Sequence, residues 1–289
     1  MEYFVSADRK AYHDWQIELL VESFKNHSVA PKLFIGTNKS IYNRYGFLDN
    51  CNNHQNIYLY DDLGKKRGFE PLNELYQLLW LLVSKKLKNS IMVIKPHMIL
   101  KKYDDIISAS DSRAFLYASD PLFTFDCALQ KCGQFYKNMK NNKEFYQEKW
   151  FNLGNAFIMH GIPDWFVQKV VQTAEELITN QIMEKNDIWS ETVKLAWVIS
   201  IIDASKDIEI YENHDLVSIM NDGRDTMFID YEHGIPPDFT RSMFTFTPPR
   251  FLSFGDPIEV ISKCIYTPNS HMMAKIAQTI MLNRKRKQS

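Results

Sequence analysis

Hydrophobic and polar residues follow two alternating patterns along the first hundred residues. Short apolar runs predict β-strands at residues 3–6, 32–35, 56–60 and 91–94. Between these runs, apolar residues recur at the three- and four-residue spacing of one helix face. The helical positions are Trp15, Leu19, Leu20 and Phe24 in one segment and Leu72, Leu75, Leu78, Leu79 and Leu82 in another. This alternation of strands and helices predicts an α/β fold with a parallel, doubly wound sheet.

The remainder of the chain has a less regular pattern. Strands are predicted at residues 115–117, 155–159, 207–211 and 226–230. Helices are predicted after Pro163, from Trp189 to Ile201 and from His271 to Met281. The Lys- and Asn-rich residues 137–143 are expected to form an exposed surface segment, and the prolines between 236 and 249 an irregular wrap. Because no internal repeat or linker separates these segments, a single domain is predicted.

Composition excludes several classes of protein. The chain has 45% hydrophobic and 24% charged residues with a net charge of -1, which is ordinary for a soluble globular protein. It has 10 glycines and neither a G-x-G-x-x-G nor a G-x-x-x-x-G-K motif. The four cysteines form no C-x-x-C pair, and the longest apolar run, residues 78–83, is too short to span a bilayer. No signal peptide is recognised at the N-terminus, so a cytoplasmic location without membrane attachment is expected.

The end of the first predicted strand carries polar residues. Ser6, Asp8 and Arg9 follow it, and ligands of open α/β sheets bind outside the carboxyl ends of strands. A carboxylate and a guanidinium there could contact the base, ribose or phosphates of a nucleotide. Asp8 could instead serve only as the N-cap of the next helix.

Several short motifs occur in the order seen in one group of glycosyltransferases. They are Asp8-Arg9, Tyr12 and Trp15-Gln16; Gly68 to Leu72; Ile94 to Leu100; Leu153-Gly154-Asn155; Trp189-Ser190-Glu191; and Phe228 to Gly234. Together they resemble the hydroxyproline O-arabinosyltransferases and the peptidyl-serine galactosyltransferases of plants. The resemblance runs from about residue 3 to residue 250. Each motif is weak by itself, and their shared order is more specific.

The resemblance implies a GT-A fold, with residues 1–105 as a nucleotide-sugar-binding half and 106–289 as an acceptor half with a C-terminal wrap. It implies a UDP-sugar donor, plausibly UDP-arabinose, and generally a divalent Mn²⁺ or Mg²⁺ ion. The donor-binding residues that it implies are Ser6, Asp8, Arg9, Tyr12, Gln16, Lys95, His233 and Gly234. Those expected to contact the sugar or acceptor are Asn152, Asn155, Trp189 and Glu191. As an alternative, Glu191 could pair with Lys194 one turn later, and Asn152 and Asn155 could cap a loop.

One departure from the family changes the expected chemistry. The chain has no Asp-x-Asp motif, and Lys95 and His97 occupy the positions of the family's acidic pair, while Asp230 aligns with its late histidine. His97 and Asp230 could therefore still hold a metal ion. Alternatively, Lys95 could neutralise the leaving diphosphate directly, and we favour this alternative because a lysine repels a nearby dication. The expected catalytic residues are Lys95, Glu191 and Asp230.

The resemblance and the composition lead to a functional hypothesis. The chain is similar to the DNA arabinosyltransferases of T4-like phages, which implies a retaining transfer of a sugar, plausibly arabinose, to hydroxymethylated or hydroxylated cytosine in double-stranded DNA. The enzyme would then act in the cytoplasm of a phage host. One alternative is a UDP-sugar glycosyltransferase that acts on a protein or glycan hydroxyl, and another is a non-catalytic nucleotide-sugar or nucleic-acid binder. Basic stretches at residues 85–88, 137–143 and 284–287 could contact phosphates or simply be solvated. The sequence leaves the oligomeric state open.

Overall fold

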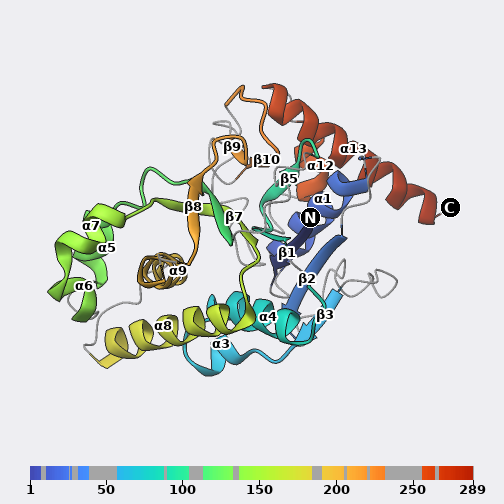
Figure 1. Cartoon of the computed structure of the whole chain (residues 1–289). Helices are drawn as coiled ribbons and strands as arrows, with labels where there is room; N and C mark the ends of the chain where they lie inside the picture. Colours follow the sequence, from blue (N-terminus) through green and yellow to red (C-terminus); the bar gives the residue numbers. More distant parts are fainter. Residues whose placement is uncertain are drawn as a thin grey trace. The chain divides into compact units, whose positions relative to one another are not determined.

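A computed structural model describes most of the chain (Figure 1). The described residues are 1–7, 11–25, 27, 32–38, 57–87, 90–103, 113–132, 137–183, 191–204, 207–219, 222–231, 256–263 and 267–288. They divide into two compact units, each made of separate parts of the chain. Unit 1 comprises Met1–Phe4, Tyr60–Val93 and Ile107–His214, and unit 2 comprises Val5–Leu59, Ile94–Ile106 and Asp215–Ser289.

The described strands form two sheets. The larger sheet has seven strands in the order β3-β2-β1-β4-β7-β6-β8, and the smaller has three in the order β5-β10-β9. The strands of the larger sheet are β1 (Glu2–Ser6), β2 (Lys32–Asn38), β3 (Ile57–Tyr60), β4 (Ser90–Ile94), β6 (Ala114–Ser119), β7 (Leu153–His160) and β8 (Glu209–Glu212). Those of the smaller sheet are β5 (Met98–Leu100), β9 (Val217–Ile219) and β10 (Phe228–Asp230). The predicted strands of the first hundred residues are therefore present, and the fold is α/β.

The larger sheet contains both strand directions. Strand β7 runs antiparallel to β4 and to β6, whereas β8 runs parallel to β6. Helix α1 (Ala11–Lys25) connects β1 to β2, and α3 (Leu63–Lys66) and α4 (Leu72–Val83) lie between β3 and β4. Helical crossovers of this kind are typical of parallel strands. The antiparallel β7 is a feature that the apolar pattern did not predict.

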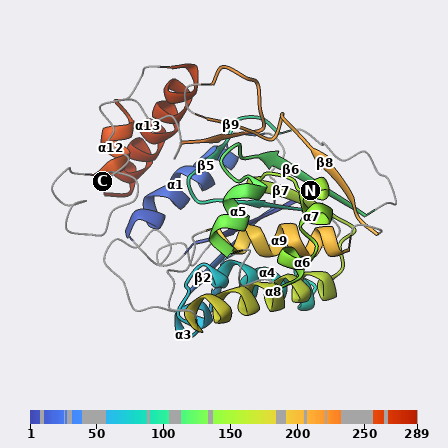
Figure 2. The same ribbon diagram turned by 90° about the vertical axis from the view of Figure 1, so that its left-hand side faces the viewer.

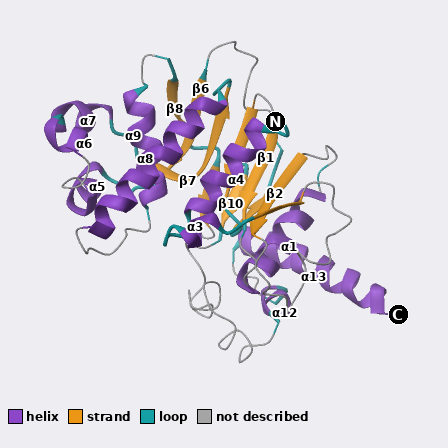
Figure 3. Cartoon of the chain, turned by 90° about the horizontal axis from the view of Figure 1, so that it is seen from below, coloured by secondary structure: helices purple, strands orange, loops and turns teal. Residues whose placement is uncertain are grey.

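Unit 1 is built around strands β6 and β7 and two long helices. Helices α8 (Asp164–Met183) and α9 (Thr192–Asp203) pack together, and α4 lies alongside α8 (Figure 3). The indole of Trp197 in α9 lies 4.9 Å from the ring of Phe157 and 6.0 Å from that of Phe115. Because α9 is buried on nearly all sides, its sequence is apolar all round rather than on a single face.

Three short helices of unit 1 lie in and just before the Lys- and Asn-rich segment. Residues 137–143, expected to be an exposed surface segment, form α6 (Lys137–Asn141) and the start of α7 (Lys143–Lys149), after α5 (Phe125–Cys132). Tyr146 of α7 is buried and donates a hydrogen bond to Asp203 of α9 (2.6 Å). The tertiary contact therefore stabilises a helix whose Lys- and Asn-rich sequence is a weak helix signal.

Unit 2 has its own core of helices packed on the small sheet. Helices α12 (Pro257–Ile261) and α13 (Pro268–Gln288) lie side by side, next to α1 (Figures 1 and 2). Residues from all three helices and from β5 and β10 form one apolar cluster, with Trp15, Leu19, Ile99, Ile229, Ile258, Ile261, Met273, Ile276 and Ile280 among its members. Residues 235–249, expected to form a proline-rich wrap, lie outside the described residues. None of the described helices is both long enough and apolar enough to cross a membrane.

Candidate functional site

The structure describes about half of the residues that the sequence analysis selected. Ser6, Gln16, Lys95, His97, Asn152, Asn155, Glu191 and Asp230 are described. Asp8, Arg9, Trp189, His233 and Gly234 lie outside the described residues, and Tyr12 belongs to α1 without a described side chain. The structure therefore does not test the roles that the resemblance implies for these last six residues.

Residues 95–97 form a tight turn between β4 and β5, which we call the 95–97 turn. The backbone N–H of Met98 donates to the carbonyl of Lys95 (3.2 Å) and closes the turn. Lys95 is partly buried, so its side chain does not simply extend into solvent. Strand β5 pairs antiparallel with β10, with Met98 opposite Asp230. The pairing places the 95–97 turn beside the end of β10.

His97 and Asp230 meet at this point, as the sequence analysis suggested. Nε2 of His97 lies 3.7 Å from Oδ2 of Asp230, which is ion-pair distance but longer than a hydrogen bond. The side chains are 16% and 4% exposed, respectively. A carboxylate buried to this extent requires partners, and the imidazole of His97 is one of them. The structure thus brings together two residues that are distant in the sequence.

Tyr231 holds the 95–97 turn against β10. Its N–H donates to the carbonyl of His97 (3.2 Å), and its hydroxyl lies 3.4 Å from the carbonyl of Pro96. Its ring meets the His97 imidazole edge to face, with centroids 6.5 Å apart, and contacts Trp15 of α1 at 6.0 Å. Tyr231 is fully buried, so these contacts anchor the turn to the apolar core of unit 2. Tyr231 lies in the motif of residues 228–234, and its part in holding the turn was not predicted.

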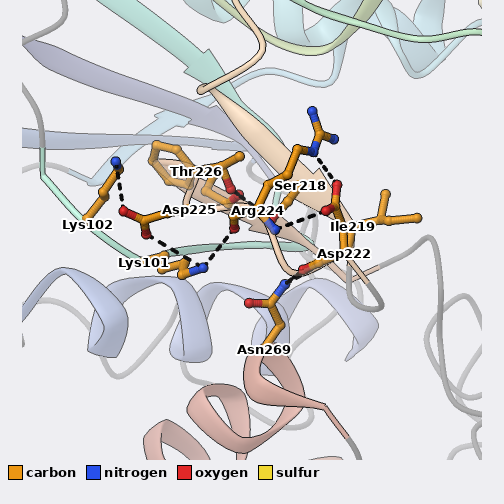
Figure 4. A network of polar contacts seen from close by, with 10 residues as sticks. Lys101, Lys102, Ser218, Ile219, Asp222, Arg224, Asp225, Thr226 and Asn269 are labelled. Atoms are coloured by element: carbon orange, nitrogen blue, oxygen red, sulfur yellow. Dashed lines mark hydrogen bonds and ion pairs between the residues drawn. The ribbon is translucent and has the colours of Figure 1, made fainter.

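A polar network fixes the segment that precedes β10 (Figure 4). Lys101 and Lys102, just after β5, both pair with Asp225, and Lys101 also donates to the carbonyl of Arg224 (2.9 Å). From α13, the side-chain amide of Asn269 donates to the carbonyls of Ile219 (3.1 Å) and Asp222 (2.7 Å).

Thr226 completes this network at the start of β10. Its hydroxyl donates to the Phe228 carbonyl (2.8 Å) and lies 2.7 Å from Oγ of Ser218. Together these bonds set the position of β10 and therefore of Asp230.

His97 and Asp230 at the 95–97 turn offer part of the donor set that a divalent cation needs. Imidazole and carboxylate are both ligands that Mn²⁺ accepts. Within the described part of the chain, however, no group of three or more His, Cys, Asp or Glu side chains converges on one point. A cation held by His97 and Asp230 would take its other ligands from water and from the donor's phosphates. Lys95, in the same turn, offers a positive charge of its own.

The end of β1 lies at the point where the order of strands reverses. The chain passes from β1 to β2 and β3 on one side and returns to β4 on the other side of β1. Ser6 is the last residue of β1, and Ala7 donates to the carbonyl of Gly36 in β2 (2.8 Å). Gln16 is buried in α1. Such a reversal is where open α/β sheets bind ligands.

Unit 1 contains a second polar group, centred on Asp120 and Lys194. Nζ of Lys194, in the first turn of α9, lies 3.0 Å from Oδ2 of Asp120, and the side chains are 16% and 25% exposed. Asp120 directly follows β6, and its N–H donates to the carbonyl of Asn152 (2.8 Å). The lysine thus pairs with Asp120 on another element, whereas the sequence spacing suggested Glu191.

The other predicted acceptor residues lie on elements that surround this pair. Asn155 is partly buried in β7, and Glu191 occupies the N-cap position of α9, where its side chain makes no capping bond. Lys194 also lies over the ring of Phe123 at 5.7 Å, and Phe123 stacks on Trp150 at 5.5 Å. Sequence reasoning missed Asp120, although it follows a predicted strand in the same way that Asp8 does.

Gly154 brings β6 and β7 into close contact beside this pair. A Cβ atom at Gly154 would lie 2.5 Å from the carbonyl oxygen of Ala118, so only glycine fits. The register of β6 and β7 shifts at the same place, between Tyr117 and Ser119. The close packing of β6 and β7 therefore explains why the motif Leu153-Gly154-Asn155 contains a glycine.

Comparison with known proteins identifies the fold. No family model matches the sequence, and no curated protein is similar to it. The bifunctional glycosyltransferase WbbM, solved in its apo form, superposes with a TM-score of 0.48 and 11% sequence identity. The match covers 96% of this chain and 51% of the WbbM chain, so this chain spans about half the length of WbbM. The galactosyltransferase LgtC, solved in complex with donor and acceptor sugar analogs, has a TM-score of 0.54 and 11% identity over 96% of both chains. The chain thus has the GT-A-like α/β fold that the resemblance predicts.

Proposed function

We propose that the protein is a UDP-sugar-dependent glycosyltransferase. The observation that carries this proposal is the contact between the 95–97 turn and the end of β10, where His97 lies 3.7 Å from Asp230. The turn leaves β4, which neighbours β1 at the reversal of the strand order. A nucleotide bound outside the end of β1 would therefore present its phosphates toward residues that follow β1 and β4. The LgtC-like fold supports this arrangement.

The donor site combines residues from β1, α1 and the two motif segments. In the proposal, Ser6, Asp8 and Arg9 contact the uridine, and Tyr12 and Gln16 support them from α1. Lys95 neutralises the diphosphate as it leaves, and His233 and Gly234 contact it, with the glycine allowing the backbone to approach closely. The bond between the anomeric carbon and the UDP oxygen breaks, the acceptor oxygen bonds to that carbon, and the proton of the acceptor hydroxyl passes to the phosphate of the departing UDP. The stereochemistry at that carbon is retained.

The proposal assigns the positive charge in the site to Lys95. The Lys95 ammonium can stabilise developing charge without a metal ion, because it is partly buried and belongs to a turn that Tyr231 fixes. If Mn²⁺ or Mg²⁺ binds, His97 and Asp230 would hold it, and it would act as a Lewis acid on the diphosphate. Asp230 otherwise orients His97 and the 95–97 turn.

The proposed acceptor is hydroxymethylated or hydroxylated cytosine in phage DNA, and the proposed sugar is arabinose. The hydroxyl of such a base lies in the major groove, where a protein can reach it in duplex DNA. Asn152, Asn155, Trp189 and Glu191 are the proposed contacts to sugar and acceptor, and the enzyme would act in the cytoplasm of the phage host. The proposal of a DNA acceptor rests on the sequence resemblance, and it is tested separately from the donor assignment.

Calorimetry with UDP, ADP and GDP tests the donor assignment. We expect UDP to bind clearly more tightly than either purine nucleotide, and Lys95→Ala to weaken binding of UDP more than binding of uridine. The same variant reports whether Lys95 faces the phosphates. Equal affinities for the three nucleotides would overturn the donor assignment, and a total lack of nucleotide binding would overturn the proposed function.

A further inference from the structure

Helix α13 has an unusual charge composition. Its sequence, PNSHMMAKIAQTIMLNRKRKQ, contains Lys275, Arg284, Lys285, Arg286 and Lys287 but no Asp or Glu. The chain as a whole has a net charge of -1. Positive charge is therefore concentrated on one element of unit 2, and the donor site does not account for it.

The buried and exposed faces of α13 differ sharply. The buried face is apolar and packs against α1 and α12 through Met273, Ala274, Ile276, Ala277 and Ile280. After Pro268, the exposed residues recur at intervals of three and four along the opposite face up to Lys285, which Arg286 follows directly, and they are His271, Lys275, Gln278, Leu282, Lys285 and Arg286. We call His271, Lys275, Lys285 and Arg286 the basic face. The last turns of α13 extend beyond α1 and α12 (Figures 1 and 3).

Arg284 is not part of the basic face, because it forms ion pairs with carboxylates of unit 2. Its guanidinium donates to both carboxylate oxygens of Glu18 in α1 and pairs with Asp256 at the N-cap of α12. Burial raises the pKa of the Glu18 carboxyl, and Arg284 opposes that effect. Arg284 thus fastens α13 to α1 and α12. Its neighbours Lys285 and Arg286 remain on the exposed side.

The chemistry of the basic face favours the phosphate backbone of a nucleic acid over a lipid bilayer as its partner. An interfacial helix inserts an exposed apolar face into the bilayer, but the apolar face of α13 is already buried in the protein. Leu282, at 57% exposure, is the one large apolar side chain on the exposed face of the described helix. Lys275 and Arg286 are separated by roughly 16 Å along a helix with a rise of about 1.5 Å per residue, enough to follow several phosphates of a duplex.

We propose that the basic face of α13 docks the phosphate backbone of duplex DNA. The proposal rests on the proposed function in taking DNA as the acceptor, and it adds the surface that holds the acceptor. Contacts of this kind fix the orientation of a protein on DNA and carry no sequence information. The transferase would therefore hold duplex DNA in a sequence-independent way.

Fluorescence anisotropy with an unmodified 30-bp duplex, over a range of salt concentrations, tests the docking surface (the duplex length is about three helical turns). The variant is Lys275→Gln/Lys285→Gln/Arg286→Gln, which keeps the side chains long and helix-favouring. Each lost phosphate contact lowers the slope of log K against log salt by about 0.9. We therefore expect a slope shallower by almost three and at least a tenfold weaker affinity near 0.1 M salt.

The matched control removes the same charge from exposed lysines of unit 1. Lys65→Gln/Lys66→Gln/Lys86→Gln should bind DNA like the wild type, and circular dichroism should show both triple variants folded. Wild-type affinity in the α13 variant, or an equal loss in the control, would overturn the proposal. Binding to anionic vesicles but not to DNA would also overturn it. Because the assay needs no sugar donor, absence of sugar transfer with intact DNA binding would contradict the proposed function alone.

Discussion

Asp230 lies 3.7 Å from Nε2 of His97, and it is almost fully buried while the histidine is only slightly exposed. In the resembling transferases an acidic motif follows the strand that corresponds to β4, and a histidine follows the late strand. Here the histidine follows β4 and the carboxylate ends β10. In the alignment that the resemblance implies, the histidine and the carboxylate stand on exchanged elements, and in this chain those elements pair with Met98 opposite Asp230. We propose that a donor-binding site is present here although the acidic motif is absent.

Lys95→Ala should remove most of the turnover and leave the fold intact. Loss of a group that stabilises the departing diphosphate should raise the activation barrier by about 2.7–4 kcal/mol, as for loss of one oxyanion donor. Steady-state kinetics and thermal melting measure the two effects. Lys66→Ala, which removes an exposed lysine of α3, is the matched control and should retain activity. Turnover within a few-fold of wild type in Lys95→Ala would show that Lys95 has no catalytic role.

Removal of divalent cations should have little effect on activity. A lysine close to a dication opposes its binding by at least about 1 kcal/mol even in high dielectric, so the proposal assigns the charge to Lys95. Activity should persist in excess EDTA after elemental analysis confirms that metal is absent. Strict dependence on Mn²⁺ or Mg²⁺, with weaker metal binding in both His97→Ala and Asp230→Ala, would restore a metal-dependent mechanism.

The pair of Asp120 and Lys194 should contribute more to stability than an exposed pair does. A double-mutant cycle with Asp120→Asn and Lys194→Met should give a coupling energy of about 0.5–3 kcal/mol, because both side chains are largely buried. The exposed pair of Glu259 in α12 and Lys263, which follows that helix, serves as the comparison and should give a clearly smaller coupling energy. Equal coupling energies in the two cycles would contradict this account of unit 1.

Gly154→Ala should destabilise the protein through a backbone clash. The new Cβ would lie 2.5 Å from the carbonyl oxygen of Ala118, so β6 and β7 would have to separate. Overpacking of this kind costs about 1–3 kcal/mol of the free energy of unfolding. Urea unfolding measures it. Gly223→Ala is the control, because a Cβ there meets nothing within 4 Å. Similar unfolding free energies for both variants would show that the close approach of β6 and β7 does not require a glycine at position 154.

The first half of the fold was predictable from the sequence because its strands are short apolar runs. Residues 3–6 and 91–94 belong to strands β1 and β4, whose middle residues are buried, so each appears as an apolar run bounded by polar residues. The direction of β7 was not predictable, since periodicity does not encode which strands become neighbours. Strands β5 and β9 have three residues each, too few to show a pattern.

The candidate site, like the fold, was predictable from the sequence only in part. The 95–97 turn and Asp230 were found because motif order along the chain resembles that of known transferases. The partnership of Lys194 with Asp120 was missed because it depends on the packing of α9 near the end of β6, whereas sequence spacing suggested only Glu191, three residues away. Tyr231 was passed over because its role consists of bonds to backbone carbonyls of the 95–97 turn.

Mass spectrometry of nucleosides tests the central claim most directly. The protein would be incubated with UDP-arabinose, or with other UDP-sugars, and with duplex DNA that contains hydroxymethylcytosine, and the DNA would then be digested to nucleosides. The account predicts a modified cytidine heavier by one sugar residue, absent when the donor is omitted and strongly reduced with Lys95→Ala. Consumption of UDP-sugar with no sugar on any nucleoside, but with sugar on a protein or glycan hydroxyl, would contradict the DNA acceptor. No transfer from any UDP-sugar to any of these acceptors would contradict the assignment as a glycosyltransferase.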